Sequence, residues 1–278
     1  MESMSKSPHM VFDGRGRRRL GGFEMVDSLI HDGLWDVYND EHMGNTGETV
    51  ALEHGISRED SDSFTVRSHL LASSAWDNGW FDWEVVPVSV PQRRKDPVLV
   101  ERDEGFRADT SLEGLSSLRP AFDKEGQVTA GNASQISDGA AAVLVADRVL
   151  AEDMGWEIIC SIKDHVTSGV APARVMSAPI PAIEALLERN GLGVLDVDLY
   201  EHNEAFAAAS CSVFKAIDIP IDRFNVHGGA VALGHPLGAS GTRCLITLLG
   251  AMRRTDAKNG IVTLCLGGGN AVAMLVER

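Results

Sequence analysis

Residues 225–243 read NVHGGAVALGHPLGASGTR, and residues 265–270 read CLGGGN just before the last apolar segment of the chain. The two stretches place an imidazole, on His235, and a thiol, on Cys265, in separate glycine-rich turns. Glycine adopts positive φ angles without steric cost, so such turns let the backbone approach a ligand closely. The residues after Gly241 have a helical pattern, which predicts His235 just ahead of a helix N-terminus. Developing negative charge is stabilised at such a place.

Two shorter motifs lie upstream of these turns. Residues 203–207 read NEAFA, and residues 129–134 read TAGNAS and are followed by DGAAA at 138–142. In kind and order, the four segments resemble the signature segments of the thiolase family, whose members make and cleave 3-ketoacyl-CoA thioesters. The resemblance covers the whole chain. It implies an α/β thiolase fold of mixed sheets covered by helices, with a complete C-terminal repeat, a truncated N-terminal repeat and a loop domain.

The resemblance also indicates a missing part. Residues 1–5 are similar to a family segment that normally lies well inside the protein, downstream of a nucleophilic cysteine at a helix N-terminus. Of the four cysteines, Cys265 fits the family's acid/base position, whereas Cys211 and Cys244 fall in Ala/Leu-rich helical stretches typical of buried thiols. Cys160 begins an extended run without a neighbouring histidine or glycine turn. We therefore interpret the chain as a thiolase that lacks its first repeat and its nucleophile.

Composition narrows the class of protein. The chain has 278 residues, 44% of them hydrophobic, and a formal net charge of −15, which argues against general nucleic-acid binding. Four cysteines without metal-ligand spacing favour reduced thiols in the cytoplasm and argue against a site for zinc or another metal. No apolar run follows the basic residues 15–19 or approaches the ~18 residues needed to cross a bilayer, so neither a signal peptide nor membrane binding is predicted.

A basic group stands out in this acidic chain. Arg93, Arg94 and Lys95 are followed closely by Arg102 and Arg107. The group is either a solvated loop or a functional surface that attracts coenzyme A phosphates or packs at a subunit contact.

We predict four regions: residues 1–5 as the end of the truncated N-terminal repeat, 6–135 as the loop domain that covers coenzyme A, 136–157 as the remainder of the N-terminal domain, and 158–278 as the C-terminal domain. Residues 57–60 resemble a capping box at the start of a helix with Phe64, Val66, Leu70 and Leu71 on its apolar face. The pattern further predicts a strand over 140–146 and a helix over 147–154. Downstream it predicts an extended run over 158–162 and helices over 180–190, 204–216 and 238–253, of which the first begins at Pro181 and is closed by Gly191. It also predicts strands over 197–200, 261–264 and 271–276, the last two joined in a hairpin by the three glycines.

The resemblance assigns chemistry to particular residues. It makes Cys265 the acid/base at the substrate α-carbon, while His235 activates an acyl-accepting thiol and, with a water held by Asn203, forms an oxyanion hole for the thioester oxygen. The backbone N–H of Gly267 is the family's donor in a second oxyanion hole. The two acidic residues beside Asn203, Glu201 and Glu204, are interpreted as structural groups that orient this turn. His227 is interpreted as a packing residue.

The substrate contacts also follow from the resemblance. The expected substrate-binding residues are His42, Met43, Arg107, Phe122, Ala130, Ala133, Ser134, Ile136, Ala205 and Phe206. Met43 beside the acyl group would shorten the pocket, as in the acetyl-CoA acetyltransferase branch.

Two functions remain open at this point. The first is an acetyl-CoA C-acetyltransferase acting on acetyl-CoA and a short 3-ketoacyl-CoA, with coenzyme A thioesters as substrates and no tightly bound cofactor. The second is a non-catalytic CoA-binding or scaffold subunit that pairs with a separate nucleophile-bearing protein. Family members are dimers or tetramers, so the resemblance also implies a homo-oligomer.

Overall fold

A hairpin of two apolar strands lies at the centre of the computed structural model, which describes residues 1–12, 16 and 21–278. Strands β11 (Asn259–Leu266) and β12 (Asn270–Glu277) are joined by residues 267–269, of which Gly268 and Gly269 have φ angles of 85° and 91°. Only glycine adopts such angles readily, so the three-glycine run determines where the chain reverses. The basic residues 15 and 17–19 lie outside the described residues.

Two more strands complete a mixed sheet. Among the described residues its order is β10-β11-β12-β9, with β10 (Leu199–His202) parallel to β11 and β9 (Ser161–Gly169) antiparallel to β12. The carboxyl ends of the parallel strands β10 and β11 therefore meet at the same edge of the sheet.

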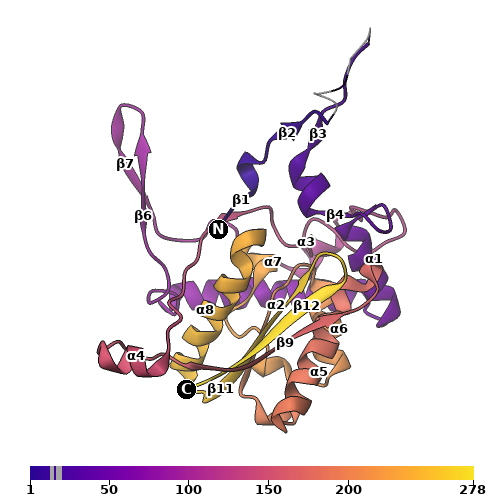
Figure 1. Cartoon of the computed structure of the whole chain (residues 1–278). Helices are drawn as coiled ribbons and strands as arrows, with labels where there is room; N and C mark the ends of the chain where they lie inside the picture. Colours follow the sequence, from indigo (N-terminus) through magenta and orange to yellow (C-terminus); the bar gives the residue numbers. More distant parts are fainter. Residues whose placement is uncertain (13–15, 17–20) are drawn as a thin grey trace.

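Helices cover both faces of this sheet (Figure 1). Ile261 packs in one core with α5 (Pro179–Asn190) and α6 (Ala207–Ala216), while its neighbour Val262 packs in a second core with α8 (Leu237–Thr255). Successive strand residues point to opposite faces, so this pair shows directly that the sheet has two buried sides. The predicted mixed sheet with helices on both faces is confirmed.

Two helices from the first third of the chain add a further layer against α6. They are α1 (Met43–Glu53) and α2 (Arg58–Asp77). The predicted capping box is confirmed, since the Ser57 hydroxyl accepts from the Asp60 N–H and the Asp60 carboxylate accepts from the Ser57 N–H. The predicted apolar face is partly wrong: Phe64 is buried, but Leu70 is half exposed. Small and polar residues such as Ser68 and Ala72 face inward instead, because α2 packs closely against the glycine turn at Gly228.

The remaining elements are short or peripheral. The paired short strands are β1 (Glu2–Ser3) with β8 (Asp138–Gly139), β2 (His9–Met10) with β3 (Val26–Asp27), and β4 (Trp35–Asp36) with β5 (Glu41–His42). The short helices are α3 (Leu112–Ser116), α4 (Arg148–Asp153), α7 (Ala230–Leu233), the π-helix η2 (Leu29–Gly33) and the 3₁₀ turns η1 (Met4–Lys6), η3 (Pro172–Ser177), η4 (Val194–Asp196) and η5 (Ile221–Arg223).

The strand predicted over 140–146 is wrong. Residues 140–146 lie outside any strand. The two-residue strand β8, which pairs with β1, ends just before them. Leu144 is 77% exposed and Val145 is 67% exposed. An apolar segment forms a strand only when a neighbour supplies hydrogen bonds, and the described chain supplies none there.

The other predicted elements are present with shifted ends. The helix predicted over 147–154 is α4, and those predicted over 180–190, 204–216 and 238–253 are α5, α6 and α8. Gly191 closes α5 in a left-handed conformation as predicted, but the helix starts at Pro179 rather than Pro181. The extended run predicted over 158–162 corresponds to β9, which begins later, at Ser161, and is longer.

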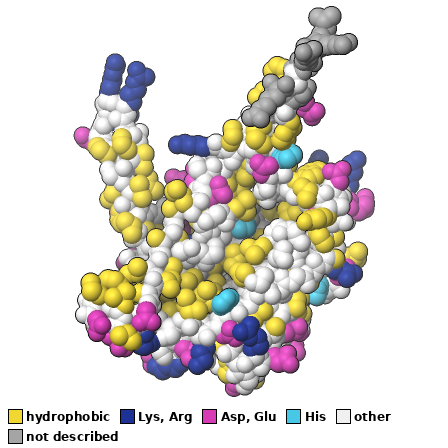
Figure 2. All heavy atoms as spheres, viewed as in Figure 1, with side chains coloured by type: hydrophobic (Ala, Val, Ile, Leu, Met, Phe, Trp, Pro, Cys, Tyr) yellow, Lys and Arg dark blue, Asp and Glu magenta, His cyan; other side chains and the backbone are white. Residues whose placement is uncertain are grey.

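The basic group is divided between separate places. Arg93 and Arg94 join β6 (Val88–Gln92) to β7 (Lys95–Val100), a hairpin that projects from the body with Lys and Arg side chains at its end (Figures 1 and 2). Arg102 pairs with Asp77 near the body, and Arg107 lines a cavity. The five residues therefore do not form one surface.

Candidate active site

His235 lies between α7 and α8, where it is held at both ring nitrogens. Its Nδ1 is 2.6 Å from the Ser240 hydroxyl, and its Nε2 is 3.2 Å from Nδ2 of Asn203. Gly234 has a φ of 92°, and a Cβ at this position would collide with Ser137, so glycine is required just before the histidine. The prediction that His235 precedes a helix start is confirmed, since α8 begins at Leu237.

Asn203 follows the last residue of β10 and is fully buried. Its backbone N–H donates to the Thr263 carbonyl of β11 at 3.1 Å, and Cys265 lies two residues further along the same strand. The parallel β10–β11 pair therefore brings the Asn203 turn and the Cys265 turn to the same sheet edge. Through its side chain Asn203 also contacts His235, so one residue connects both glycine-rich segments.

Cys265 is half-buried in a small apolar cluster. Its Sγ lies 3.8 Å from the Met176 thioether, and the cluster also contains Met43, Ala133 and Phe206. Burial raises the pKa of the Cys265 thiol to about 11, so the group is protonated at neutral pH. Four of the predicted substrate-binding residues, Met43, Ala133, Ala205 and Phe206, therefore pack in the same cluster as the predicted acid/base.

The TAGNAS and NEAFA segments are joined side by side. The Ser134 N–H donates to the Ala205 carbonyl at 3.0 Å, and Ala133 pairs with Phe206 in an isolated bridge. Phe122 packs edge-on against Phe206, with ring centroids 6.3 Å apart.

His42 and Phe122 form a stacked pair at the start of α1. Their ring centroids are 4.7 Å apart, and Nδ1 of His42 accepts from the Gly44 N–H at 2.9 Å, which caps the helix. The Phe122 ring occupies the space that a Cβ on Gly44 would need. The predicted residues His42, Met43 and Phe122 therefore lie together at this helix end.

Next to the apolar cluster of Cys265 lies an open cavity of about 290 Å³, lined in part by Arg107, Ala130 and Ala133. The Arg107 N–H donates to Nδ1 of His69, whose pKa is lowered to about 4 by burial and by the charge of Arg107. The other lining residues are His69, Asp109, Thr110, Ser111, Gly114, Leu115, Leu118, Gly131, Gln135 and Val231.

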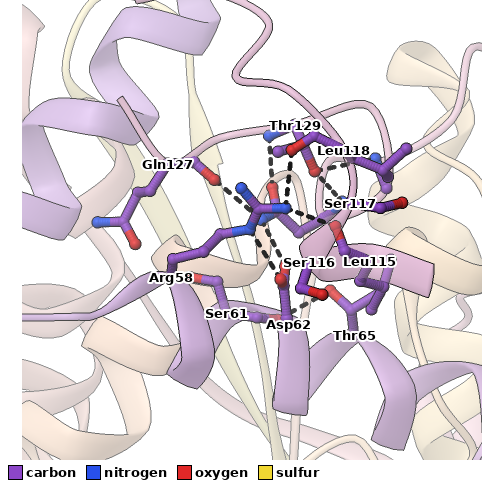
Figure 3. A network of polar contacts seen from close by, with 12 residues as sticks. Arg58, Ser61, Asp62, Thr65, Leu115, Ser116, Ser117, Leu118, Gln127 and Thr129 are labelled. Carbon is purple, nitrogen blue, oxygen red and sulfur yellow. Dashed lines mark hydrogen bonds and ion pairs between the residues drawn. The ribbon is translucent and has the colours of Figure 1, made fainter. Parts of the chain in front are cut away.

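A buried polar network holds the walls of this cavity in place (Figure 3). Arg58 pairs with Asp62 at 2.7 Å and donates to the carbonyls of Leu115 and Leu118 at 2.6 and 3.2 Å. Asp62 also accepts from the Asn132 amide at 3.0 Å. Helix α2 is thereby hydrogen-bonded to both α3 and the TAGNAS loop, which border the cavity.

Two predicted residues lie apart from these clusters. Ile136 is 68% exposed and does not line the cavity. Gly267 lies in the exposed turn between β11 and β12, with open space where a side chain would be.

The other cysteines lie in different environments. Cys211 and Cys244 are buried, as predicted, and burial raises both pKa values to about 12. Cys160 is half-buried beside the α8 core, and burial raises its pKa as well.

Three polar residues near Asn203 were missed or underestimated by sequence reasoning. Ser240 and Arg243 lie on the first turns of α8, and Glu201 lies on β10. Their signal in the sequence is the spacing of Ser240 and Arg243, three residues apart on a helix that follows His235. Glu204 has a structural role, as predicted: it accepts from Ser68, Asn225 and the Val231 N–H.

The part of the chain that the structure describes contains no group of three or more His, Cys, Asp or Glu residues arranged to hold a metal ion. Within the same residues, every helix is too short or too polar to span a bilayer.

This fold and these motifs define the class of protein: the chain belongs to the thiolase family. The family model of the thiolase N-terminal domain matches residues 1–149, and that of the thiolase C-terminal domain matches residues 156–278.

Individual relatives agree with this assignment. The chain is 48% identical to an acetyl-CoA acetyltransferase of Cupriavidus necator over 277 residues, which span all of this chain and 70% of the relative. Among solved structures, the Bacillus anthracis acetyl-CoA acetyltransferase has a TM-score of 0.96 and 38% identity over 99% of this chain and 70% of that one. Human mitochondrial 3-ketoacyl-CoA thiolase in complex with CoA has a TM-score of 0.92 and 37% identity, covering 99% of this chain and 69% of that one. The predicted thiolase fold is thus confirmed.

Proposed function

We propose that the chain acts as an acetyl-CoA C-acetyltransferase that forms or cleaves acetoacetyl-CoA or another short 3-ketoacyl-CoA. The observation that carries this proposal is the position of Asn203, which contacts His235 and directly follows β10, beside the strand β11 that presents Cys265. The names of the bacterial relatives support the same reaction class.

In this proposal the half-buried thiol of Cys265 exchanges a proton with the substrate α-carbon. A thiol whose pKa is about 11 is a strong base once ionised, which suits the removal of a weakly acidic proton beside a thioester carbonyl. The Gly267 N–H would stabilise the enolate oxygen that forms, and its turn is open enough to admit one.

His235 and Asn203 serve the acyl-transfer half of the reaction. Burial and the charge of Arg243 lower the pKa of His235 to about 4, so its imidazole is neutral at pH 7 and can accept a thiol proton. The protonated ring, together with a water held by Asn203, would then donate to the thioester oxygen.

The acyl-CoA would enter along the cavity of about 290 Å³. Arg107 at its mouth would attract a phosphate, and the small residues Ala130 and Ala133 leave room for an extended pantetheine arm. Ser134, Ala205 and Phe206 would then meet the thioester end, with Met43 limiting the length of the acyl chain. Ile136, being exposed, would contribute only at the rim.

We also propose that the acyl-carrying thiol is not one of the four cysteines of these 278 residues. Cys211 and Cys244 are buried with pKa values near 12, and Cys160 packs in the α8 core rather than in the cluster of Cys265. Incubation with acetyl-CoA should leave all four unacetylated in peptide mass spectrometry. Stoichiometric acetylation of any one of them would contradict this part of the proposal.

The proton-transfer half of the reaction can be tested on its own. Acetyl-CoA that carries a trideuterated acetyl group should lose deuterium to water in the presence of the chain, because enolisation needs no acyl-carrying thiol. Cys265→Ser should slow this loss at least about 100-fold, since it removes the base. Cys160→Ser is the matched control and should leave the rate unchanged. Deuterium loss that is insensitive to Cys265→Ser would contradict the assigned role.

A second function, a CoA-binding or scaffold subunit, is favoured by one observation. A groove of about 620 Å³ outside the site is lined by Val143, Leu144, Val145, Trp156 and Ile158, among others. An apolar surface of this kind suits an apolar strand of another polypeptide. If the chain binds CoA in calorimetry but never exchanges α-deuterium, and a nucleophile-bearing polypeptide co-purifies with it, this function replaces the first. Homo-oligomer formation and a cytoplasmic location remain expectations in either case.

A further inference from the structure

One face of α8 carries three residues that converge on the candidate site. Ser240, Arg243 and Cys244 are spaced three and four residues apart, so their side chains lie on the same side of the helix. Ser240 contacts His235, whereas Arg243 and Cys244 both contact Oδ1 of Asn203. His235 and Asn203 take part in the proposed reaction, whereas the three α8 residues behind them have no direct role in it.

Arg243 is a largely buried cation with two acceptors. Its guanidinium donates to Oε1 of Glu201 at 3.1 Å and, over a longer 3.5 Å, to Oδ1 of Asn203. The side chains of Arg243 and Glu201 are only 19% and 2% exposed. Glu201 lies on β10 and Asn203 directly follows that strand, and the contacts of Arg243 show that one guanidinium reaches both.

Hydrogen-bond polarity then fixes the orientation of the Asn203 amide. A guanidinium can only donate, so the Asn203 atom that faces Arg243 must be the carbonyl oxygen. The amide nitrogen is thereby turned toward His235, where it must donate to Nε2.

The same ring state is required from the other side of His235. The Ser240 hydroxyl donates to the Pro236 carbonyl at 2.9 Å, which leaves its oxygen to accept from the His235 ring at 2.6 Å. The proton of the neutral ring therefore belongs on Nδ1, and Nε2 keeps its lone pair. Two independent contacts thus select one tautomer of His235.

We propose that Arg243 is a positioning residue that, through the Asn203 amide, holds His235 in the tautomer with an unprotonated Nε2. The inference rests on the proposed function, since it explains how His235, the proposed base for the acyl-accepting thiol, keeps an unprotonated Nε2. If Arg243 did not hold Oδ1, the amide could rotate by half a turn at little cost. Its oxygen would then face Nε2 and favour the opposite tautomer.

The test is the tautomer itself, measured by ¹⁵N NMR of histidine-labelled protein at pH 7, with His235 assigned through His235→Gln. We expect the wild-type ring to be protonated at Nδ1. Arg243→Lys should raise the Nε2-protonated fraction at least five-fold, because an ammonium that satisfies Glu201 cannot also reach Asn203 in the same geometry. A residue that merely neutralises Glu201 would be replaced by lysine without any change in the tautomer.

Arg254→Lys on the same helix is the matched control, because it should alter the signal of His227 and not that of His235. The double variant Glu201→Gln/Arg243→Met removes both buried charges and should give the same shift as Arg243→Lys. A folded Arg243→Lys protein with an unchanged tautomer, or a wild-type ring protonated at Nε2, overturns the inference. Failure of α-deuterium exchange with the tautomer shift intact would instead contradict only the proposed reaction.

Discussion

His227 is buried in a stack of aromatic and cationic groups at the glycine turn. Its Nε2 accepts from Nε of Arg254 at 2.9 Å, and the Trp80 ring lies against both side chains. Burial, and then the charge of Arg254, lower the pKa of His227 to about 4. A second proton on this ring would place two donors against each other, so the fold keeps the ring neutral.

This arrangement makes stability depend on pH. Below pH 6.5 the unfolded chain binds a proton at His227, whereas His227 in the folded chain stays unprotonated down to about pH 4. The stabilisation by the neutral ring is therefore lost as the pH falls from 6.5 toward 4. Between pH 7.5 and pH 5 the stability advantage of the wild type over His227→Gln should shrink by about 2 kcal/mol. Urea unfolding at both pH values measures this difference, and the other titrating groups cancel in it. An advantage that stays constant with pH would contradict the argument.

At the residue scale, sequence reasoning found the groups that carry chemistry and missed those that orient them. His235 and Cys265 stand in glycine-rich turns, which is a local signal that can be read from the chain. Arg243 and Ser240 look like ordinary polar residues of an amphipathic helix. Their importance depends on contacts with β10, and no local pattern reports such contacts.

At the scale of single elements, the capping box of α2 can be tested directly. Ser57→Ala removes the hydroxyl that accepts from Asp60 and should lower the free energy of unfolding by about 1 kcal/mol. Ser63→Ala, on the exposed side of the same helix, is the control and should change the free energy of unfolding by no more than a few tenths of a kcal/mol. Equal effects of the two substitutions in thermal unfolding would show that the cap contributes nothing.

The predictions of helices and strands were right where a glycine stop signal agrees with the local spacing of apolar residues. Gly191 closes α5 and the three glycines reverse the β11–β12 hairpin, and both features were predicted from sequence. The strand prediction for residues 140–146 failed because their apolar composition is typical of a strand, but among the described residues no neighbouring strand pairs with them. Strand formation is decided by pairing with residues far away in the chain, which composition does not contain.

At the scale of the whole molecule, the exposed apolar groove beside α4 should govern solution behaviour. Figure 2 shows hydrophobic side chains gathered on this lower part of the molecule. Leu144→Lys places a charge in the groove and should lower light scattering and binding of an environment-sensitive apolar dye. Leu52→Lys changes an equally exposed leucine on α1 outside the groove and should have little effect. Similar reductions by both substitutions would mean that net charge, rather than the groove, controls aggregation.

The two halves of the proposed site are built on different kinds of support. Asn203 directly follows β10 and Cys265 lies on the adjoining strand β11 of a buried sheet, whereas the cavity of about 290 Å³ is bordered by turns anchored through Arg58 and Asp62. A laboratory selection for bulkier thioesters could therefore vary the turns freely and leave the reactive framework untouched. Substrate range in such a protein can diverge while its reaction stays the same.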